Sequence, residues 1–164
     1  MVIARHLDIM GWQVRVWLIG DRNSLSTDCR TNLAILERSE WKIGLVCDGL
    51  SPMMVELVAD MKASTVMVDA MLGTGSKGPL RQAMSEVVRA ANQVGALRIA
   101  VDQPTGMDAQ TGEVYDPCIQ AAVTYTFVAK KPGLLCEKAR QVVGDLIVIS
   151  IGIPRSLIAA MTAV

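Results

Sequence analysis

The sequence predicts an α/β fold in which a doubly wound, mostly parallel sheet carries helices on both faces. Short apolar runs alternate along the chain with amphipathic stretches, and a glycine-rich segment separates one apolar run from the amphipathic stretch that follows it. The chain contains neither an internal repeat nor a low-complexity linker. Strands that alternate with helices pair in parallel and are covered on both faces, which gives this architecture.

The composition bounds the class of protein. The 164 residues fit one domain, which we expect to span residues 1–164. Sixteen basic residues balance sixteen acidic ones, so no charge excess favours nucleic acid or an anionic membrane as partner. No apolar stretch reaches the ~20 residues that span a bilayer. The four cysteines are scattered singly, and we expect a cytoplasmic protein with free cysteines and no zinc site.

The first half of the chain contains the end signals of three helices. Gly11 is a good stop for the first helix, and Pro52 stands where the first turn of the third helix tolerates proline. Either Ser24 or Ser26 can cap the second helix. The expected elements are, in order, a helix over residues 2–10, a strand over 12–19, a helix over 24–38, a strand over 42–47, a helix over 51–61 and a strand over 65–72.

The second half is richer in strands. We expect a helix over residues 80–94, strands over 97–101, 122–128 and 145–151, and a short helix after Pro154. Because no long helix separates the last three strands, part of the far edge of the sheet is expected to be antiparallel. Ligands of such folds bind beyond the carboxyl ends of the strands, so the segments after Leu72 and Val101 are the places to look for a site.

Asp69 is the one acidic residue of an otherwise apolar strand. A buried carboxylate costs several kcal/mol unless it is paired or bound to a cation. Two interpretations stay open from the residues alone. Asp69 either caps a nearby backbone turn or binds a cation or a substrate hydroxyl.

The segment from Gly73 to Pro79 (GTGSKGP) follows this strand and precedes a helix. Its glycines let the backbone approach a ligand and turn N–H groups toward an anion, and the helix N-terminus also favours phosphate. The segment lacks the lysine position of a Walker loop, because Pro79 follows Gly78, which excludes a kinase-type phosphate loop. Lys77 is either a cation at the mouth of this site or a solvated surface residue.

The run DQPTGMD, residues 102–108, is the more specific signal. Asp102 leaves the end of a buried strand, Pro104 stiffens the turn, and Thr105 adds a hydroxyl. A carboxylate in this place can accept hydrogen bonds from a sugar or act as acid and base. Asp108 is interpreted as a cap of the loop that follows.

Four segments in this order resemble the NAD(P)H-hydrate epimerases, the YjeF N-terminal-domain family: VDAMLGTGSKGPL, VDQPTGMDAQTGEV, TYTFVAKKPGL and VGDLIVISIGIP. The opening segment MVIARHLDIMGWQVRVWLIG resembles the part of the family that follows its first phosphate loop. The resemblance covers essentially the whole chain. It implies a Rossmann-like fold, an isomerase that interconverts the R and S hydrates of NADH and NADPH, a homodimer, and coupling to an NAD(P)H-hydrate dehydratase that uses one epimer.

The resemblance also implies roles for particular residues. Asp69 and Thr105 match the family's potassium ligands, and oxygen ligands suit such a hard cation. Asp102 matches the substrate-binding and catalytic aspartate, and Lys77 matches a catalytic lysine opposite it. The residues that match the loop in contact with the dinucleotide are Gly73, Thr74, Gly75, Ser76, Lys77, Gly78 and Pro79.

The sequence departs from the family's pattern at its start. Family members begin with further residues that include a central strand and a GNNGGDG-type loop, so we expect an N-terminally truncated form, from a misassigned start codon or from genuine shortening. A sheet without that strand would have unpaired edges, and we expect weak nucleotide binding, low stability and association. Smaller departures are Gln103 for the usual isoleucine, Thr105 for serine and Ala122 for aspartate.

Two alternatives to the epimerase each fit part of the sequence. A non-catalytic nucleotide-binding or scaffold module derived from the same fold would accommodate the loss of the phosphate loop, but it has no need of two strand-end carboxylates. A generic Rossmann-type enzyme, such as a methyltransferase, explains the alternation of elements but leaves the DQPTGMD run unexplained.

Overall fold

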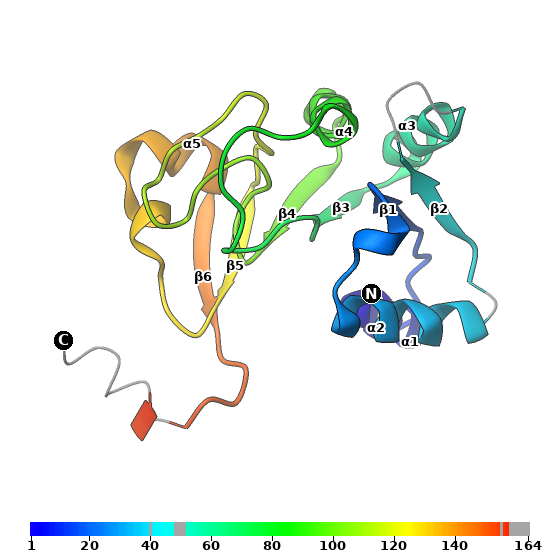
Figure 1. Ribbon diagram of the computed structural model, residues 1–164, viewed down its shortest axis with the longest axis horizontal. Helices are drawn as coiled ribbons and strands as arrows, with labels where there is room; N and C mark the ends of the chain where they lie inside the picture. Colours follow the sequence, from blue (N-terminus) through cyan, green and yellow to red (C-terminus); the bar gives the residue numbers. More distant parts are fainter. Residues whose placement is uncertain (40, 48–51, 155, 158–164) are drawn as a thin grey trace.

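The computed structural model describes residues 1–39, 41–47, 52–154 and 156–157 (Figure 1). The helices are α1 (Val2–Ile9), α2 (Thr27–Arg38), α3 (Met53–Ala63), α4 (Gln82–Gln93) and α5 (Arg140–Val143), with short 3-10 turns η1 (Arg22–Ser24), η2 (Pro132–Leu135) and η3 (Glu137–Ala139). The strands are β1 (Val16–Ile19), β2 (Ile43–Val46), β3 (Val66–Asp69), β4 (Leu97–Val101), β5 (Val123–Phe127) and β6 (Asp145–Ile149). The helix expected after Pro154 falls mostly outside the described residues.

The strands form two parallel sheets. β1 pairs with β2, and β3, β4, β5 and β6 pair in that order, every pair being parallel. The doubly wound, mostly parallel fold is confirmed, and β1 and β3 share no ladder among the described residues. The expectation of an antiparallel far edge is wrong. The segments 102–122 and 128–144 are long enough to carry the chain back to the starting edge of the sheet without a long helix.

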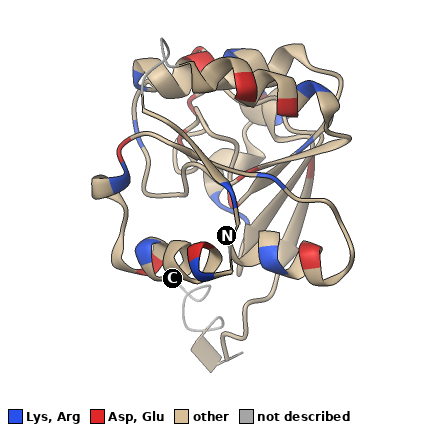
Figure 2. Cartoon of the chain, turned by 90° about the vertical axis from the view of Figure 1, so that its right-hand side faces the viewer, with Lys and Arg blue, Asp and Glu red and all other residues tan. Residues whose placement is uncertain are grey.

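Helices lie on both sides of the β1–β2 pair. Figure 1 shows α1 and α2 on one side and α3 on the other, while α4 and α5 lie on the same side of the larger sheet as α3. The acidic and basic residues lie mostly on the helices and loops, and the strands contain few of them (Figure 2). This is the charge distribution expected of a layered fold whose helices face water on their outer side.

Two apolar clusters hold these layers together. Helix α4 turns Val87, Val88 and Ala91 inward, at the spacing of one helical face. They join Val46 of β2 and Ala100 of β4 in the larger cluster. The smaller cluster lies beneath the loop after β4 and α5; its buried members are Met107, Cys118, Leu134, Ala139, Val142 and Val143.

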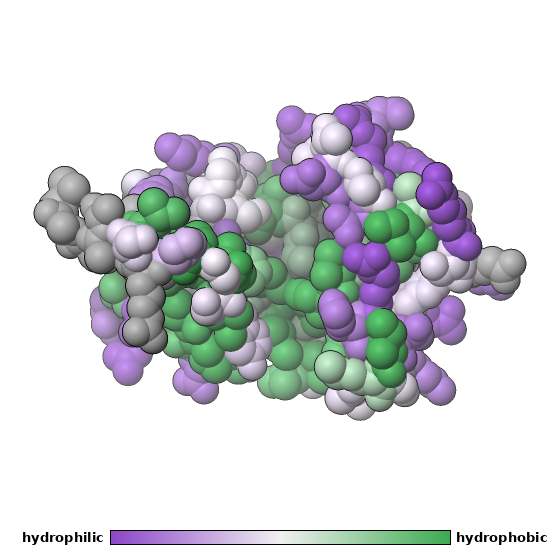
Figure 3. Space-filling view, turned by 90° about the horizontal axis from the view of Figure 1, so that it is seen from below, coloured by the Kyte–Doolittle hydropathy of each residue, from purple (hydrophilic) through white to green (hydrophobic). Residues whose placement is uncertain are grey.

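The face of the larger sheet opposite α4 is apolar and partly exposed. Val68, Leu97 and Ile147 are 40%, 47% and 40% exposed there, and Figure 3 shows apolar surface on this side of the molecule. Among the described helices, none is both long and apolar enough to cross a membrane. The expected low stability and association of the chain remain predictions.

Candidate functional site

The site lies where β3 and β4 end. Asp69 is the last residue of β3 and pairs in register with Ala100 of β4, so the segment after β4 begins beside its carboxylate. The Thr105 N–H donates to Asp69 Oδ2 at 2.7 Å, and the Thr105 hydroxyl donates to Oδ1 at 2.7 Å. The Met71 N–H adds a longer bond of 3.3 Å to Oδ1. One carboxylate thus joins the segment after β3 to the segment after β4.

Asp69 is only 7% exposed, and Thr105 is fully buried. Burial raises the pKa of the Asp69 carboxyl group, and the hydrogen bonds from Thr105 and Met71 oppose that rise. These bonds bear out the interpretation of Asp69 as a cap of nearby backbone. A cation beside it would favour the charged form further.

The hydrogen-bond partners of the Asp69 carboxylate are the N–H groups of Thr105 and Met71 and the Thr105 hydroxyl. The described residues include no group of three or more His, Cys, Asp or Glu side chains that could hold a metal ion. Asp69 and Thr105 supply a carboxylate and a hydroxyl, and Thr105 Oγ1 also accepts a 3.3 Å bond from the Leu72 N–H. This donor set fits a weakly bound hard cation that completes its shell with carbonyl oxygens or water, and it does not fit zinc.

Asp102 follows β4 in a left-handed backbone conformation, with φ of 73°. A residue other than glycine in this region is strained and is held by its surroundings. Here the Asp102 N–H donates to the Tyr125 carbonyl of β5 at 2.7 Å. Its side-chain Oδ2 accepts the Thr74 N–H at 3.2 Å. The strained turn therefore brings the carboxylate against the glycine-rich segment, as the sequence predicts.

Lys131 is a site residue that the sequence reasoning missed. Its Nζ lies 2.6 Å from Asp102 Oδ1, 2.7 Å from Thr126 Oγ1 and 3.0 Å from the Phe127 carbonyl oxygen. The Asp102 and Lys131 side chains are 17% and 18% exposed. A signal was present in TYTFVAKKPGL, where two lysines follow a buried strand immediately before proline.

Lys131 also affects the pKa of the Asp102 carboxyl group. Partial burial raises the pKa of Asp102, but the hydrogen bond and charge of Lys131, with the Thr74 N–H, lower it by more. The pKa of Asp102 therefore lies below its ordinary value. At neutral pH Asp102 is a carboxylate, ready to accept a proton.

Gln103 ties the two loops of the site together. Its side chain is fully buried, and Nε2 donates to the carbonyl oxygens of Gly73 and Met107, each at 3.1 Å. Its Oε1 has no hydrogen-bond partner among the described residues. The Gln103 amide therefore donates two hydrogen bonds that the isoleucine expected from the resemblance could not donate.

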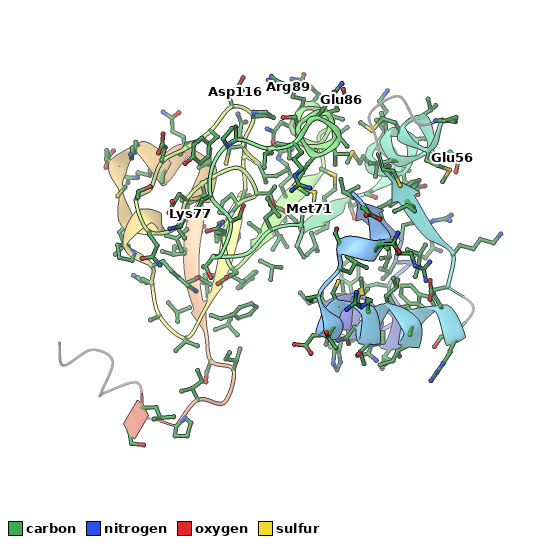
Figure 4. All side chains as sticks on the ribbon, viewed as in Figure 1. Glu56, Met71, Lys77, Glu86, Arg89 and Asp116 are labelled. Atoms are coloured by element: carbon green, nitrogen blue, oxygen red, sulfur yellow. The ribbon has the colours of Figure 1, made fainter. Side chains whose placement is uncertain are left out.

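Lys77 is exposed. The N–H groups of Gln110 and Thr111 and, more weakly, the charge of Lys77 hold the pKa of Asp108 below its ordinary value. Lys77 thus lies close enough to Asp108 for its charge to act on that carboxyl group, and Figure 4 labels the Lys77 side chain. Within the described residues it forms no hydrogen bond or ion pair with Asp102, and its catalytic role stays a prediction.

The rest of the glycine-rich segment forms an open turn. The Ser76 N–H donates to the Gly73 carbonyl at 3.0 Å, and Gly78 has φ of 81°, a conformation that favours glycine. A Cβ on Gly73 would lie 3.5 Å from Asp102 Oδ2, which shows how closely this backbone approaches the carboxylate. Gly75 and Pro79 are exposed, so the turn is accessible to a ligand.

Comparison with known proteins identifies relatives over nearly the whole chain. An "NAD(P)H-hydrate epimerase" of Rhodopirellula baltica is 38% identical over 95% of the chain, and one of Pirellula staleyi is 37% identical over 99%. A "Bifunctional NAD(P)H-hydrate repair enzyme Nnr" of Moorella thermoacetica is 38% identical over 97%. The chain spans 62%, 70% and 30% of the lengths of these three relatives, respectively.

A solved structure supports the same fold. The crystal structure of the yeast protein ynu0 superposes with a TM-score of 0.76 at 23% identity, covering 99% of this chain and 65% of the yeast chain. The family model described as "YjeF-related protein N-terminus" matches residues 1–133. On this match and on relatives that align along nearly its whole length, the chain belongs to the YjeF-related protein N-terminus family.

Proposed function

We propose that this chain carries the catalytic part of an NAD(P)H-hydrate epimerase, an isomerase that interconverts the R and S hydrates of NADH and NADPH. The names of its relatives in Rhodopirellula and Pirellula support this activity. The observation that carries the proposal is the contact between Asp102 Oδ2 and the Thr74 N–H, which sets an ionised acid/base group against a glycine-rich, ligand-accessible turn. The Asp69–Thr105 pair fixes the loop that holds Asp102.

The chemistry requires one group that can hold a proton. The hydroxyl of one hydrate takes a proton from solvent and leaves as water, water adds to the same carbon from the opposite face and gives up a proton to Asp102, and this proton is returned to solvent. The broken C–O bond is replaced by the one that forms, so no oxidant or reductant is consumed. Asp102 takes and returns this proton, a role worth ~10²–10⁴-fold in rate.

The remaining site residues bind and orient the substrate in this proposal. The backbone from Gly73 to Pro79 contacts the dinucleotide, as N–H groups at a turn before a helix suit an anion. Lys77, which is exposed, supplies positive charge near the phosphates or the departing oxygen. We also propose that Asp69 and Thr105 contribute two of the ligands of a potassium ion, which would keep the two loops in register.

Partners follow from the same proposal. Relatives named bifunctional repair enzymes, such as that of Moorella thermoacetica, support functional coupling to a second activity, which we propose is a dehydratase that consumes one epimer. The homodimer implied by the resemblance stays a prediction. The molar mass of the chain in solution, measured by light scattering, would test it.

The activity is tested with the separated R and S hydrates of NADPH and the full 164-residue chain. Interconversion above the spontaneous rate is expected, and Asp102→Asn should lower it by ~10²–10⁴-fold. Asp116→Asn is the matched control because the Asp116 side chain is 85% exposed. An Asp102→Asn variant as active as the parent would remove Asp102 from this role. Binding of the hydrate without any turnover would favour the non-catalytic module.

A further inference from the structure

Lys131 stands out because the chain takes an unusual route to bring it to the site. β5 ends at Phe127, and Val128 then has φ of 68°, a left-handed conformation that a β-branched residue rarely adopts. The turn carries the chain back over the end of β5, where Lys131 precedes the first residue of η2. The two described residues other than glycine with positive φ, Asp102 and Val128, thus place the two members of one ion pair.

The ammonium group of Lys131 has no spare donor. A lysine offers three N–H donors and no acceptor, and here Nζ contacts Asp102 Oδ1, Thr126 Oγ1 and the Phe127 carbonyl oxygen. A group so occupied is poorly suited to bind substrate or to pass on a proton. It is well suited to hold another side chain in place.

The two oxygens of Asp102 are consequently different. Oδ1 receives the Lys131 ammonium at 2.6 Å and faces the Thr126 hydroxyl at 3.5 Å. Oδ2 receives the longer bond from the Thr74 N–H at 3.2 Å. Oδ2 therefore keeps free acceptor capacity on the side of the glycine-rich turn. In the described part of the chain, Lys131 is the charged group that faces this carboxylate.

We propose that Lys131 is the positioning residue of Asp102: it holds Oδ1 and so presents Oδ2, as a carboxylate, to a substrate in the turn formed by Gly73 to Pro79. The inference rests on the proposed function for its catalytic meaning, but the ion pair on which it is built can be tested without activity. Lys131, rather than Lys77, is then the lysine on which the chemistry of Asp102 depends.

The first test follows the carboxyl carbon of Asp102 by carbon-13 NMR as the pH is varied, with the signal assigned from Asp102→Asn. Removing the ammonium in Lys131→Met should raise the titration midpoint of Asp102 by about 1–3 pH units, the usual effect of a neighbouring opposite charge. Lys131→Arg should return most of the shift. Lys130→Met is the matched control, since Lys130 is adjacent and exposed. A midpoint equal in the Lys131→Met and Lys130→Met variants would overturn the proposal.

A second variant protects the test against misfolding. Thr126→Val removes one of the three acceptors of Lys131 and keeps the charge of Lys131; it also removes the 3.5 Å contact of the Thr126 hydroxyl with Asp102 Oδ1. If Lys131→Met does not fold, the Asp102 midpoint should still rise in Thr126→Val, by less than one pH unit. An unchanged midpoint there would overturn the proposal in the same way.

The second test measures epimerisation against pH. For Lys131→Met we expect a fall in kcat at nearly constant KM, with the acid limb of kcat/KM displaced toward higher pH, and partial recovery in Lys131→Arg. A fall in rate without displacement of that limb would mean a structural role only and would overturn the positioning role. If the parent chain is inactive while the NMR midpoint still moves in Lys131→Met, the proposed function fails and the positioning of Asp102 stands.

Discussion

Thr105 binds both carboxylate oxygens of Asp69, with its N–H on Oδ2 and its hydroxyl on Oδ1, each at 2.7 Å. The two residues are 36 positions apart in the sequence and come from segments that follow neighbouring strands. This pair fixes the loop that carries Asp102 relative to the strand that leads into the glycine-rich turn. The geometry of the candidate site therefore depends on the Asp69–Thr105 contact, although neither residue binds the substrate in our proposal.

Thr105→Val tests the contribution of that hydroxyl. Valine has nearly the same shape but cannot donate to Asp69 Oδ1, which is then left with the 3.3 Å bond from Met71. We expect the free energy of unfolding to fall by about 1–3 kcal/mol, the cost of an underpaired buried acceptor. Urea unfolding measures it, and Thr105→Ser should recover most of the loss.

Thr111→Val is the control for this substitution. Thr111 is exposed, and its hydroxyl accepts one surface bond from the Glu113 N–H. Its effect should stay within about 0.5 kcal/mol. Equal losses of unfolding free energy in Thr105→Val and Thr111→Val would show that the bond from the Thr105 hydroxyl to Asp69 stabilises the fold no more than a surface contact does.

Potassium should stabilise the folded chain if Asp69 and Thr105 belong to a cation site. A ligand at ten times its dissociation constant adds about 1.4 kcal/mol to the folded state, which corresponds to a rise of roughly 3–5 °C in Tm for a chain of this size. Thermal unfolding in potassium chloride and in tetramethylammonium chloride at equal ionic strength measures the difference. Asp69→Asn should abolish it, and a rise of equal size in that variant would place the effect elsewhere.

Much of the site could be predicted from the sequence because it depends on a general property of parallel sheets. Asp69 and Asp102 both follow apolar runs, and the carboxyl ends of parallel strands share one edge. The structure accordingly sets Asp69 against Thr105 and Asp102 against Thr74. Helix ends could also be predicted, because a capping residue stands next to its helix in the sequence. Ser26 is an example, since its hydroxyl accepts the Cys29 N–H at 3.2 Å.

Lys131 and Gln103 could not be predicted because their contacts depend on the path of the backbone. The Lys131–Asp102 pair requires left-handed conformations at both Val128 and Asp102, and a β-branched valine gives no signal of one. Gln103 replaces an apolar residue of the resembled pattern, and its bonds to the Gly73 and Met107 carbonyls become visible only when the loops are placed. The residue types therefore predicted the acid/base chemistry of the site, whereas the left-handed backbone at Val128 and Asp102 determines that Lys131 contacts Asp102.

The Asp102–Lys131 pair should make the stability of the chain depend on pH in the acid range. The pKa of Asp102 is lowered in the folded chain, so the folded state binds fewer protons than the unfolded state near the unfolded pKa of ~3.9. The contribution of the pair is complete above that pKa and is lost as the pH falls through the lower, folded pKa. Urea unfolding at pH 7, 5, 4 and 3 should show the gap between the parent and Asp102→Asn narrowing below about pH 4. A gap independent of pH would contradict this account.

Gln103→Glu should be strongly destabilising at neutral pH although it preserves the shape of the side chain. The carboxylate would be buried against the Gly73 and Met107 carbonyl oxygens, which offer it no donor. An uncompensated buried charge costs about 3–5 kcal/mol. Such a glutamate has a raised pKa when folded, so the cost should shrink as the pH falls toward the unfolded value of ~4.3. Gln120→Glu, at an exposed position, is the control, and a similar loss in both variants would refute the argument.

Thiol reactivity provides a probe of burial beside Asp69. Cys118 is 7% exposed, and burial, with a smaller contribution from the charge of Asp69, raises its pKa to about 12. The thiolate is the reactive form, so at pH 8 only roughly one molecule in 10⁴ carries it there, against about one in four for a thiol with the ordinary pKa of ~8.5. We expect a disulfide reagent to label Cys118 at least about 10³-fold more slowly in the folded chain than in urea. Exposed Cys47 serves as the internal control, and peptide mapping by mass spectrometry follows both. Labelling of Cys118 as fast as that of Cys47 in the folded chain would mean that the segment around Cys118, beside Asp69, opens readily. A cation site built on Asp69 and Thr105 would then lack the fixed geometry that it requires.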